Sequence, residues 1–326
     1  MTNAPNPVSA GGRRPSAPRS GKGKLFVISG RCGRMANRMV LFAHFIALAE
    51  EQGHRVANPT FHSYARFFAA TREDIYCRYP RATRRSGWDI LPGIGGAIRT
   101  TRVFFHLARA FGLWNERYPI FGKTIFTLRQ TPGQPVTALD GPEVQAGIHD
   151  ARIVFVNGWN FRAPALVQRH AEKIRPYFRP VAEFEQASRR AVQRLRQQAD
   201  LVVGVHIRRG DYRTFREGVY FYPVARYAAW MQELAEQFPG RRVGFFVCSD
   251  EPREAKEFSG LTVVVGAGSA VADLDALSRC DYVLAPVGTF SMWASFYGNK
   301  PLFSIRERNA RIERHEFRVS DLREIP

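Results

Sequence analysis

The chain has 326 residues, of which 45% are hydrophobic and 24% are charged, and its formal net charge is +19. These values are typical of a globular protein with one or two domains. No run approaches the roughly 18 consecutive apolar residues of a membrane span, and the N-terminus lacks the apolar core of a secretory signal. We therefore expect a cytoplasmic protein.

The front of the chain carries most of the positive charge. Residues 1–24 combine Pro, Gly, Ser, Arg and Lys, which predicts a disordered basic tail. Residues 1–130 hold 21 Lys and Arg against 6 Asp and Glu, a net of +15. Such a charge favours a phosphorylated acceptor, the inner leaflet of a membrane or nucleic acid. High arginine usage in a GC-rich genome, together with general solubility, is the alternative explanation.

The four cysteines suggest no metal or disulfide framework. Cys32, Cys77, Cys248 and Cys280 lie far apart, with neither CxxC nor His/Cys zinc spacing. We expect free, mostly buried thiols in a reducing compartment.

The first predicted unit is a strand, a glycine loop and a helix. Residues 25–29, LFVIS, read as a buried strand, GRCGRMANR follows, and the helical pattern then ends at Gly53. Gly30 and Gly33 suit a βα turn, but no third glycine completes a dinucleotide fingerprint. Residues 25–180 are predicted to form an N-terminal Rossmann-like domain.

Basic and aromatic residues interleave in a helix predicted over residues 99–111. Such a pattern is found at membrane interfaces and sugar-binding clefts, and an ordinary core-packing helix is the third possibility. A second clear strand, RIVFVNGW, covers residues 152–159.

Strands and helices alternate regularly in the second half. We predict strands at residues 201–207, 243–250, 261–266 and 281–286, and helices at 181–198, 223–237, 252–258, 272–278 and from 288. This alternation predicts a parallel sheet with right-handed crossovers. The chain is therefore expected to be α/β with two doubly wound domains, the second covering residues 181–326.

Polar residues gather at three strand ends of this second domain. They are His206, Arg208, Arg209 and Asp211 on the first, Ser249 and Asp250 on the second, and Gly288, Thr289, Phe290 and Ser291 on the third. An arginine fork suits a phosphate, small residues opening a helix offer N–H groups to a second phosphate, and a carboxylate suits a base or ribose. Together they predict a pocket for a nucleoside diphosphate at the carboxyl ends of the strands.

Structural roles for the same residues remain open. His206 could be a satisfied core histidine, and Asp250 could cap the helix after Pro252. Alternation along a strand points Arg208 and Arg209 to opposite faces, so one of them is expected to be structural. Arg209 would then pair with Asp211 or Glu217. The RGD tripeptide at 209–211 is taken as chance.

Three segments resemble the fucosyltransferase superfamily, most closely the bacterial α-1,2-fucosyltransferases of glycosyltransferase family 11. They are HIRRGDY at 206–212, FVCSDE at 246–251 and GTFSMWA at 288–294. GRMANRMVLFAH at 33–44 is similar to the family's N-terminal motif, with Gly33 and Asn37 in matching places. Arg38, residues 287–288 and Met292 depart from the family pattern.

The resemblance implies a fold, a donor and a set of contacts. The fold would be GT-B, with two Rossmann-like domains facing a cleft, and GDP-fucose would react with inversion and without a metal or other cofactor. The implied donor-site residues are His206, Arg208, Arg209, Ser249, Asp250, Thr289, Phe290 and Ser291, with Gly33, Asn37 and Arg38 in the N-terminal loop on the acceptor side. Arg208 would bind the β-phosphate, and His206 with Asp250 the nucleoside.

In such a reaction a guanidinium stabilises the negative charge that grows on the departing GDP, so Arg208 is the predicted catalytic cation. Asp211 and Glu217 are candidates for the base that deprotonates the acceptor. The α-1,6 relatives carry a glutamate ten residues after the motif histidine, whereas Glu217 lies eleven after His206.

The acceptor is expected to be a glycan, as in a surface polysaccharide or a lipid-linked or anionic glycan, reached at the inner membrane face. Transfer from another nucleotide sugar is one alternative function. A nucleic-acid-binding protein is another, although the chain lacks a recognition helix, RNP-like aromatics or zinc spacing, so no specific nucleic acid is predicted as a partner.

Overall fold

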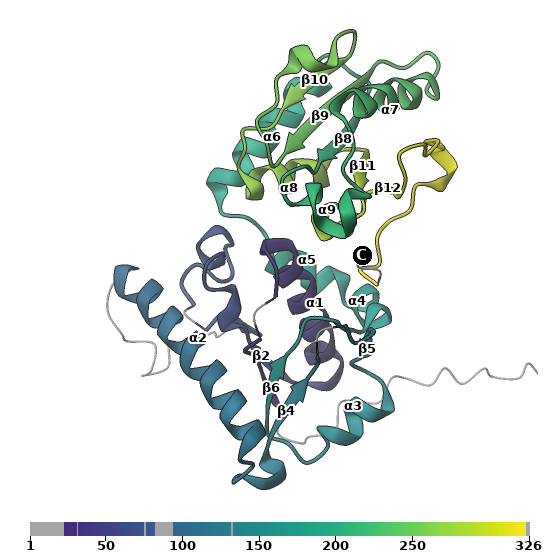
Figure 1. Cartoon of the computed structure of the whole chain (residues 1–326). Coiled ribbons are helices and arrows are strands. Elements are labelled where there is room, and N and C mark those ends of the chain that lie inside the picture. The colour runs from purple at the N-terminus through teal and green to yellow at the C-terminus, as the bar shows by residue number, and fades with distance from the viewer. Residues whose placement is uncertain (1–22, 31, 75, 82–93, 132, 324–326) are drawn as a thin grey trace, which may run out of the picture.

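The computed structural model describes residues 23–30, 32–74, 76–81, 94–131 and 133–323. Two five-stranded sheets form the centres of two lobes, one from each half of the chain (Figure 1). Apart from its last two residues, the predicted basic tail at 1–24 lies outside the described residues. The free, buried state predicted for all four cysteines is confirmed.

The first sheet has the strand order β3-β2-β1-β6-β4. Its strands are β1 (Leu25–Ile28), β2 (Arg55–Ala57), β3 (Arg78–Tyr79), β4 (Ile125–Arg129) and β6 (Ile153–Asn157). Four of them are parallel, as expected, and the two-residue β3 pairs antiparallel with β2 at the edge of the sheet. A short pair, β5 (Thr137–Ala138) and β7 (Phe161–Arg162), forms a separate ladder.

Helices cover both faces of this sheet. They are α1 (Met35–Gln52), α2 (Ile94–Arg117), α3 (Pro142–Gly147), α4 (Pro164–Arg169) and α5 (Ala171–Tyr177). The predicted strand–turn–helix unit is confirmed, and α1 ends at Gly53, whose left-handed φ of 69° a residue without a Cβ adopts easily. The helix predicted at residues 99–111 is part of the longer α2.

The second sheet is entirely parallel, with the order β10-β9-β8-β11-β12. Its strands are β8 (Leu201–Ile207), β9 (Val243–Ser249), β10 (Thr262–Val265), β11 (Tyr282–Pro286) and β12 (Leu302–Ile305). All seven residues of β8 are buried, as expected for a central strand with both faces covered. The four predicted strands are therefore confirmed, and β12 extends the sheet.

The second sheet is flanked by α6 (Ala182–Arg196), α7 (Val224–Glu236), α8 (Ala270–Arg279) and α9 (Thr289–Gly298). The helix predicted over residues 252–258 is wrong, because only a 3₁₀ turn, η7 (Ala255–Phe258), forms there. Glu254 and Glu257 close this turn with a reciprocal capping box. The chain therefore reaches β10 through a short irregular connection.

The order of the strands indicates at which edge of each sheet a ligand is expected to bind. The chain moves from β8 outward to β9 and β10 and then crosses to β11 on the other side of β8, so the sheet changes direction between β8 and β11. The first sheet does the same between β1 and β6. In open parallel sheets, ligands bind outside the carboxyl ends of the strands at these points. The chain thus forms two Rossmann-like α/β domains, as predicted.

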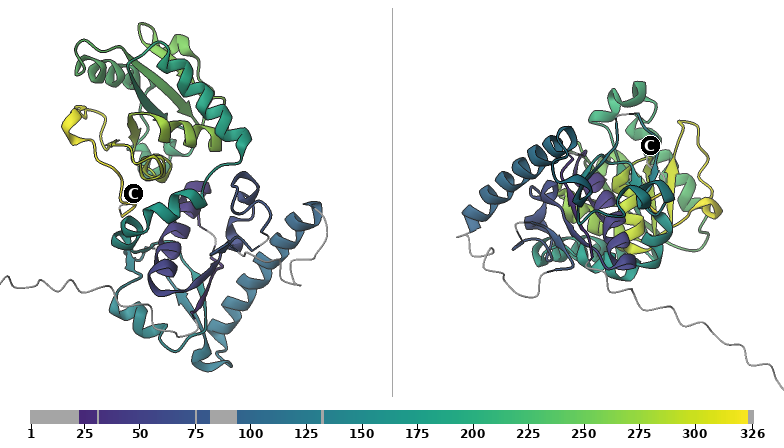
Figure 2. Two further views of the ribbon diagram at one scale, coloured as in Figure 1. Left: turned by 180° about the vertical axis from the view of Figure 1, so that it is seen from behind. Right: turned by 90° about the horizontal axis from the view of Figure 1, so that it is seen from below.

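Contacts between α1 and α9 join the two lobes, which Figures 1 and 2 show from opposite sides. The Nε of Arg175 donates to the carbonyl of Phe296 at 2.9 Å. The C-terminal segment returns to the first lobe, where the fully buried Leu322 offers its carbonyl to the ring of His44 at 3.2 Å. No described helix has both the length and the apolar character needed to cross a membrane.

Candidate functional site

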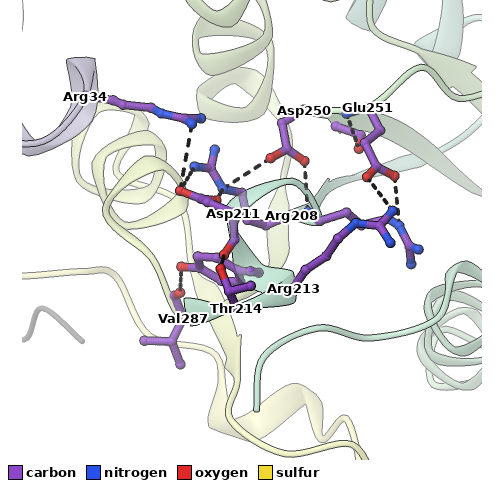
Figure 3. Close-up of polar contacts among 11 residues, drawn as sticks. Arg34, Arg208, Asp211, Arg213, Thr214, Asp250, Glu251 and Val287 are labelled. Carbon is purple, nitrogen blue, oxygen red and sulfur yellow. Dashed lines mark hydrogen bonds and ion pairs between the residues drawn. The ribbon is translucent and has the colours of Figure 1, made fainter. Parts of the chain in front are cut away.

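Arg208 lies just past the end of β8, where the chain turns into a 3₁₀ turn at Asp211–Arg213. Its Nε and Nη2 donate to the two carboxylate oxygens of Asp211, each at 2.8 Å, and its Nε lies 3.4 Å from Oδ2 of Asp250 (Figure 3). Burial opposes the charge, but these carboxylates still raise the pKa of Arg208. The guanidinium is thus held in one orientation, and its Nη1 makes no hydrogen bond with the described residues.

Asp211 braces Arg208, so the expectation that it pairs with Arg209 is wrong. The 3₁₀ turn brings the Asp211 side chain back beside the guanidinium three residues earlier. Burial acts to raise the pKa of Asp211, but the hydrogen bonds and charge of Arg208 outweigh it and lower that pKa. Both oxygens of this carboxylate are therefore engaged.

Arg209 points to the other side of the strand end, as alternation predicts. Its Nε contacts Glu251 at 2.9 Å, its Nη1 donates to the carbonyl of Tyr222 at 3.0 Å, and its guanidinium lies over the ring of Phe221. Glu251, not Asp211 or Glu217, is thus its ion-pair partner. These contacts make the Arg209 side chain a brace for the loop.

Asp250 and Ser249 hold the turn after β9. One oxygen of Asp250 accepts the backbone N–H of Arg209 at 2.8 Å, and the hydroxyl of Ser249 accepts the N–H of Glu251 at 3.2 Å. Asp250 does not cap the following turn, which Glu254 caps instead. Asp250 therefore links the ends of β8 and β9 while its second oxygen faces Arg208.

His206 is buried beneath the first turn of α9, with its ring centroid 4.7 Å from that of Phe290. Burial, with the nearby charge of Arg208, lowers the pKa of His206 to about 3, so the ring is neutral. Its Nδ1 is buried and has no hydrogen-bond partner among the described residues. Because buried polar groups normally find a partner, the alternative of a satisfied core histidine does not hold.

The N-terminus of α9 contacts the start of α1 on the other domain. No side chain caps this helix, and Thr289 donates its hydroxyl hydrogen to Asn37 near the start of α1. The fully buried Ser291 turns its hydroxyl back to the carbonyl of Gly288 at 3.1 Å. The first turn of α9 thus offers backbone N–H groups, while the Ser291 side chain serves its own helix.

The N-terminal loop and the start of α1 contribute two residues that contact the second domain. Asn37 reaches Thr289, and the exposed Arg34 brings its Nη2 to 4.0 Å from Asp211 (Figure 3). Gly33 has a φ of +36°, and a Cβ there would come 1.9 Å from Nδ2 of Asn37, so glycine is required. Arg38, by contrast, is buried and donates to the carbonyls of Cys32 at 3.2 Å and Thr60 at 2.5 Å. These hydrogen bonds hold the N-terminal loop against the interior of its own domain.

Glu217 lies on a strained, exposed turn. Glu217 and its neighbour Arg216 have φ values of 59° and 46°, a left-handed conformation that costs a non-glycine residue about 1–3 kcal/mol. The carboxylate makes no hydrogen bond or ion pair with any described residue. Strain of this kind is concentrated at functional sites, and the side chain is free to meet a ligand.

Sequence reasoning missed three residues of this region. Tyr212 donates its hydroxyl hydrogen to the carbonyl of Val287 at 2.5 Å and so fixes the loop before α9, and Arg34 enters from the other domain. Asp273 is buried in the first turn of α8, where a Cβ at Gly266 would come 2.4 Å from its Oδ1. Burial raises the pKa of Asp273 to about 7. Two of them lie inside quoted motifs, Tyr212 at the end of HIRRGDY and Arg34 in GRMANRMVLFAH, whereas Asp273 has no motif signal.

No cluster of three or more His, Cys, Asp or Glu side chains suited to a metal ion occurs within the described ranges. Metal independence therefore stays a prediction from the resemblance. The cations placed at the site are Arg208 and Arg34.

Comparisons with known proteins agree with this geometry. Residues 168–316, which include β8, α9 and their polar ends, match the model of glycosyl transferase family 11. Arabidopsis thaliana FUT1, solved as an arginine-to-lysine mutant with GDP, is 13% identical with a TM-score of 0.52, covering 89% of this chain and 73% of that one. POFUT1 in complex with GDP-fucose is also 13% identical, with a TM-score of 0.50, covering 87% and 97%. No curated protein sequence matches.

The two Rossmann-like domains have the GT-B fold. Over residues 168–316, which include HIRRGDY and GTFSMWA, the chain is similar to glycosyl transferase family 11.

Proposed function

We propose that the protein transfers L-fucose from GDP-fucose to a hydroxyl of a glycan, with inversion and most simply in an α-1,2 linkage. The observation that carries this proposal is Arg208, a guanidinium braced at the carboxyl end of β8 where the sheet changes direction. The GDP and GDP-fucose bound by the structural neighbours support the choice of donor.

The diphosphate would lie between Arg208 and the start of α9. The free Nη1 of Arg208 can bind one phosphate, and the uncapped N–H groups of Thr289, Phe290 and Ser291 suit the other. Arg34, exposed on the other domain and 4.0 Å from Asp211, lies close enough to add a second positive charge beside the same anion. Arg209 and Ser249 would support this site through the loop.

The nucleoside would be bound deeper in the second domain. The neutral His206 has an unmatched buried Nδ1, and its neighbour Phe290 offers a ring face. Asp273 and Asp250 supply carboxylate oxygens, which accept hydrogen bonds from the N–H groups of guanine or from ribose hydroxyls. Since Asp250 already holds the Arg209 backbone, we assign the base to Asp273, which lies in the first turn of α8 and makes no side-chain hydrogen bond with the described residues.

Arg208 would contribute to catalysis by stabilising the charge that develops on the departing GDP. Because Asp211 and Asp250 fix the guanidinium beforehand, it need not reorganise as the bond to fucose breaks. For the base we prefer Glu217, whose carboxylate has no partner among the described residues, to Asp211, whose two oxygens bind Arg208. Glu217 would take the proton of the attacking acceptor hydroxyl.

Gly33 and Asn37 would shape the acceptor side, with Arg38 holding their loop in place. The basic N-terminal half suits a glycan that is itself anionic or linked to a lipid phosphate. Peripheral association at the inner membrane face would bring the enzyme to such an acceptor. We infer a cytoplasmic enzyme from these features.

A nucleotide screen tests the donor. Thermal unfolding should be measured with GDP, UDP and ADP, and then with GDP-fucose and other GDP-sugars, because a ligand at 100 times its Kd adds about 2.7 kcal/mol of stability. We expect stabilisation by GDP and release of GDP from GDP-fucose in the presence of glycan acceptors. Stabilisation by UDP or ADP alone would replace the fucosyl proposal by another nucleotide-sugar transferase.

A further inference from the structure

Helix α2 lies along the outside of the N-terminal domain, and its outer side is uncovered in both side views (Figures 1 and 2). Its inner side packs through the buried Phe105, Ala108 and Asn115, and Gly112 approaches the ring of Phe155 on β6. An ordinary surface helix buries one apolar side in this way and carries polar residues on the opposite side. The outer side of α2 instead carries several large apolar side chains.

Large apolar side chains cover much of that outer side and the segment after it. Seven of the eleven exposed large hydrophobic residues in the described chain lie here. We call these seven the α2 patch: Val103, Leu107, Leu113, Trp114, Tyr118, Ile120 and Phe121. Leu107 and Ile120 are 63% and 69% exposed. Such a concentration on one surface marks an interaction site, whereas single exposed apolar residues do not.

Basic residues border the α2 patch. At 3.6 residues per turn, Val103, Leu107 and Trp114 lie within about 40° of one another, and Arg102 and Arg109 lie roughly 100–120° from Val103 on the exposed side. Arg102 and Arg109 form no ion pair with any described residue. The acidic side chains nearby are already paired: Glu116 with Arg129, and Asp150 with Lys123.

We propose that the α2 patch docks on an anionic lipid bilayer, with α2 lying in the plane of the interface. A helix that carries apolar residues beside arginines buries the first among the acyl chains and sets the second against lipid phosphates. Trp114 and Tyr118 are the residue types that prefer the headgroup level. The aromatic contacts from Phe111 to Trp114 and Phe121 give this end of the patch a fixed shape.

Charge argues against the other occupants. A second copy of the chain in a two-fold contact would place this basic surface against itself. Residues 1–22 carry four Lys and Arg and no acidic residue, so they do not complement it either. A nucleic acid would match the arginines but would leave the apolar side chains without a partner. A bilayer with anionic lipids matches both.

The experiment measures vesicle binding of the full-length protein, independently of its enzymatic activity. Co-sedimentation would use vesicles of phosphatidylcholine alone and of phosphatidylcholine mixed with phosphatidylglycerol. One variant combines Leu107→Ser with Trp114→Ser, and a second combines Arg102→Gln with Arg109→Gln. The matched controls are Val136→Ser with Val319→Ser, and Arg190→Gln with Arg194→Gln on α6, which are also exposed.

We expect the wild-type protein to bind the anionic vesicles much better than the neutral ones. The affinity of the apolar variant for the anionic vesicles should be at least about tenfold lower than that of the wild type. The affinity of the arginine variant should fall about fivefold for each charge that is lost. Both controls should bind as the wild type does. Thermal unfolding checks that each variant is folded, and the arginine variant keeps the test valid if loss of Trp114 disturbs packing.

Three results would overturn the proposal. The first is a wild-type protein that does not bind anionic vesicles. The second is equal binding by the wild type and both α2 variants, which would place the interaction elsewhere on the basic chain. The third is a dimer in sedimentation velocity without vesicles that the apolar variant abolishes, because a second copy would then be the occupant.

Discussion

Replacing Arg208 by lysine is the sharpest test of how the site works. The substitution keeps the positive charge but removes the planar fork that holds both oxygens of Asp211 at 2.8 Å. A single ammonium can remain with Asp211 or turn toward a phosphate, but it cannot keep both contacts with the present geometry. The change therefore removes preorganisation while leaving the charge in place.

The expected loss follows from what Arg208 does in the folded protein. Its side chain is only 18% exposed, so its hydrogen bonds act in a partly dehydrated site. Removing one preorganised donor to a developing negative charge typically costs 10²–10³ in turnover, about 2.7–4 kcal/mol. We expect Arg208→Lys to lower kcat by ~10² or more, with a smaller effect on GDP affinity.

The assay measures kcat and KM for GDP-fucose, together with GDP binding by thermal shift. Arg209→Lys is the matched control, since Arg209 is the next residue, is 16% exposed and is also paired with a carboxylate. It should reduce stability with little change in kcat. A near-normal kcat for Arg208→Lys, or an equal loss of kcat for both variants, would refute the assignment of Arg208 as the catalytic cation.

Asp273, Glu217 and Tyr212 can each be tested by one substitution. Burial raises the pKa of Asp273 to about 7, above its value in the unfolded chain, so the contribution of Asp273 to stability falls as pH rises from about 4 to 7. The free energy of unfolding of Asp273→Asn, measured in urea, should therefore rise by about 2–3 kcal/mol relative to wild type between pH 5 and 8, while GDP binding weakens. A difference between the two proteins that does not change with pH would contradict this. Glu217→Gln should lower kcat by about 10²–10⁴ with an unchanged Kd for GDP, and an unchanged kcat would remove Glu217 as the base. Tyr212→Phe leaves the carbonyl of Val287 without its hydrogen-bond donor, so the free energy of unfolding should fall by about 1–3 kcal/mol and KM for GDP-fucose should rise. Wild-type values for both quantities would show that this hydrogen bond does not position α9.

Periodicity in the sequence predicted the elements that carry the site. The run at residues 201–207 is apolar throughout because β8 is covered on both faces, and its limits were found without the structure. β2, β3 and β4 were not predicted. β2 and β3 have only three and two residues, and all three strands lie next to or within an arginine- and aromatic-rich region in which no period of two stands out.

The site shows the same division between local and tertiary information. That charged residues collect after β8, β9 and β11 follows from the chain alone, because parallel strands end at one edge of the sheet. Alternation also separated Arg208 from Arg209. It could not assign their partners, because the 3₁₀ turn at Asp211–Arg213 returns Asp211 to Arg208 and leaves Arg209 to Glu251.

Contacts between residues far apart in the chain were decided only by the tertiary structure. Arg34 and Asn37 reach Asp211 and Thr289 because α1 packs against α9. The sequence by itself determined which residue types stand at the strand ends, since that depends on neighbours one to four positions away. The packing of the two domains decided which of these residues come into contact. The distance between side chains on different elements depends on sheet order and domain orientation, which no local sequence pattern encodes.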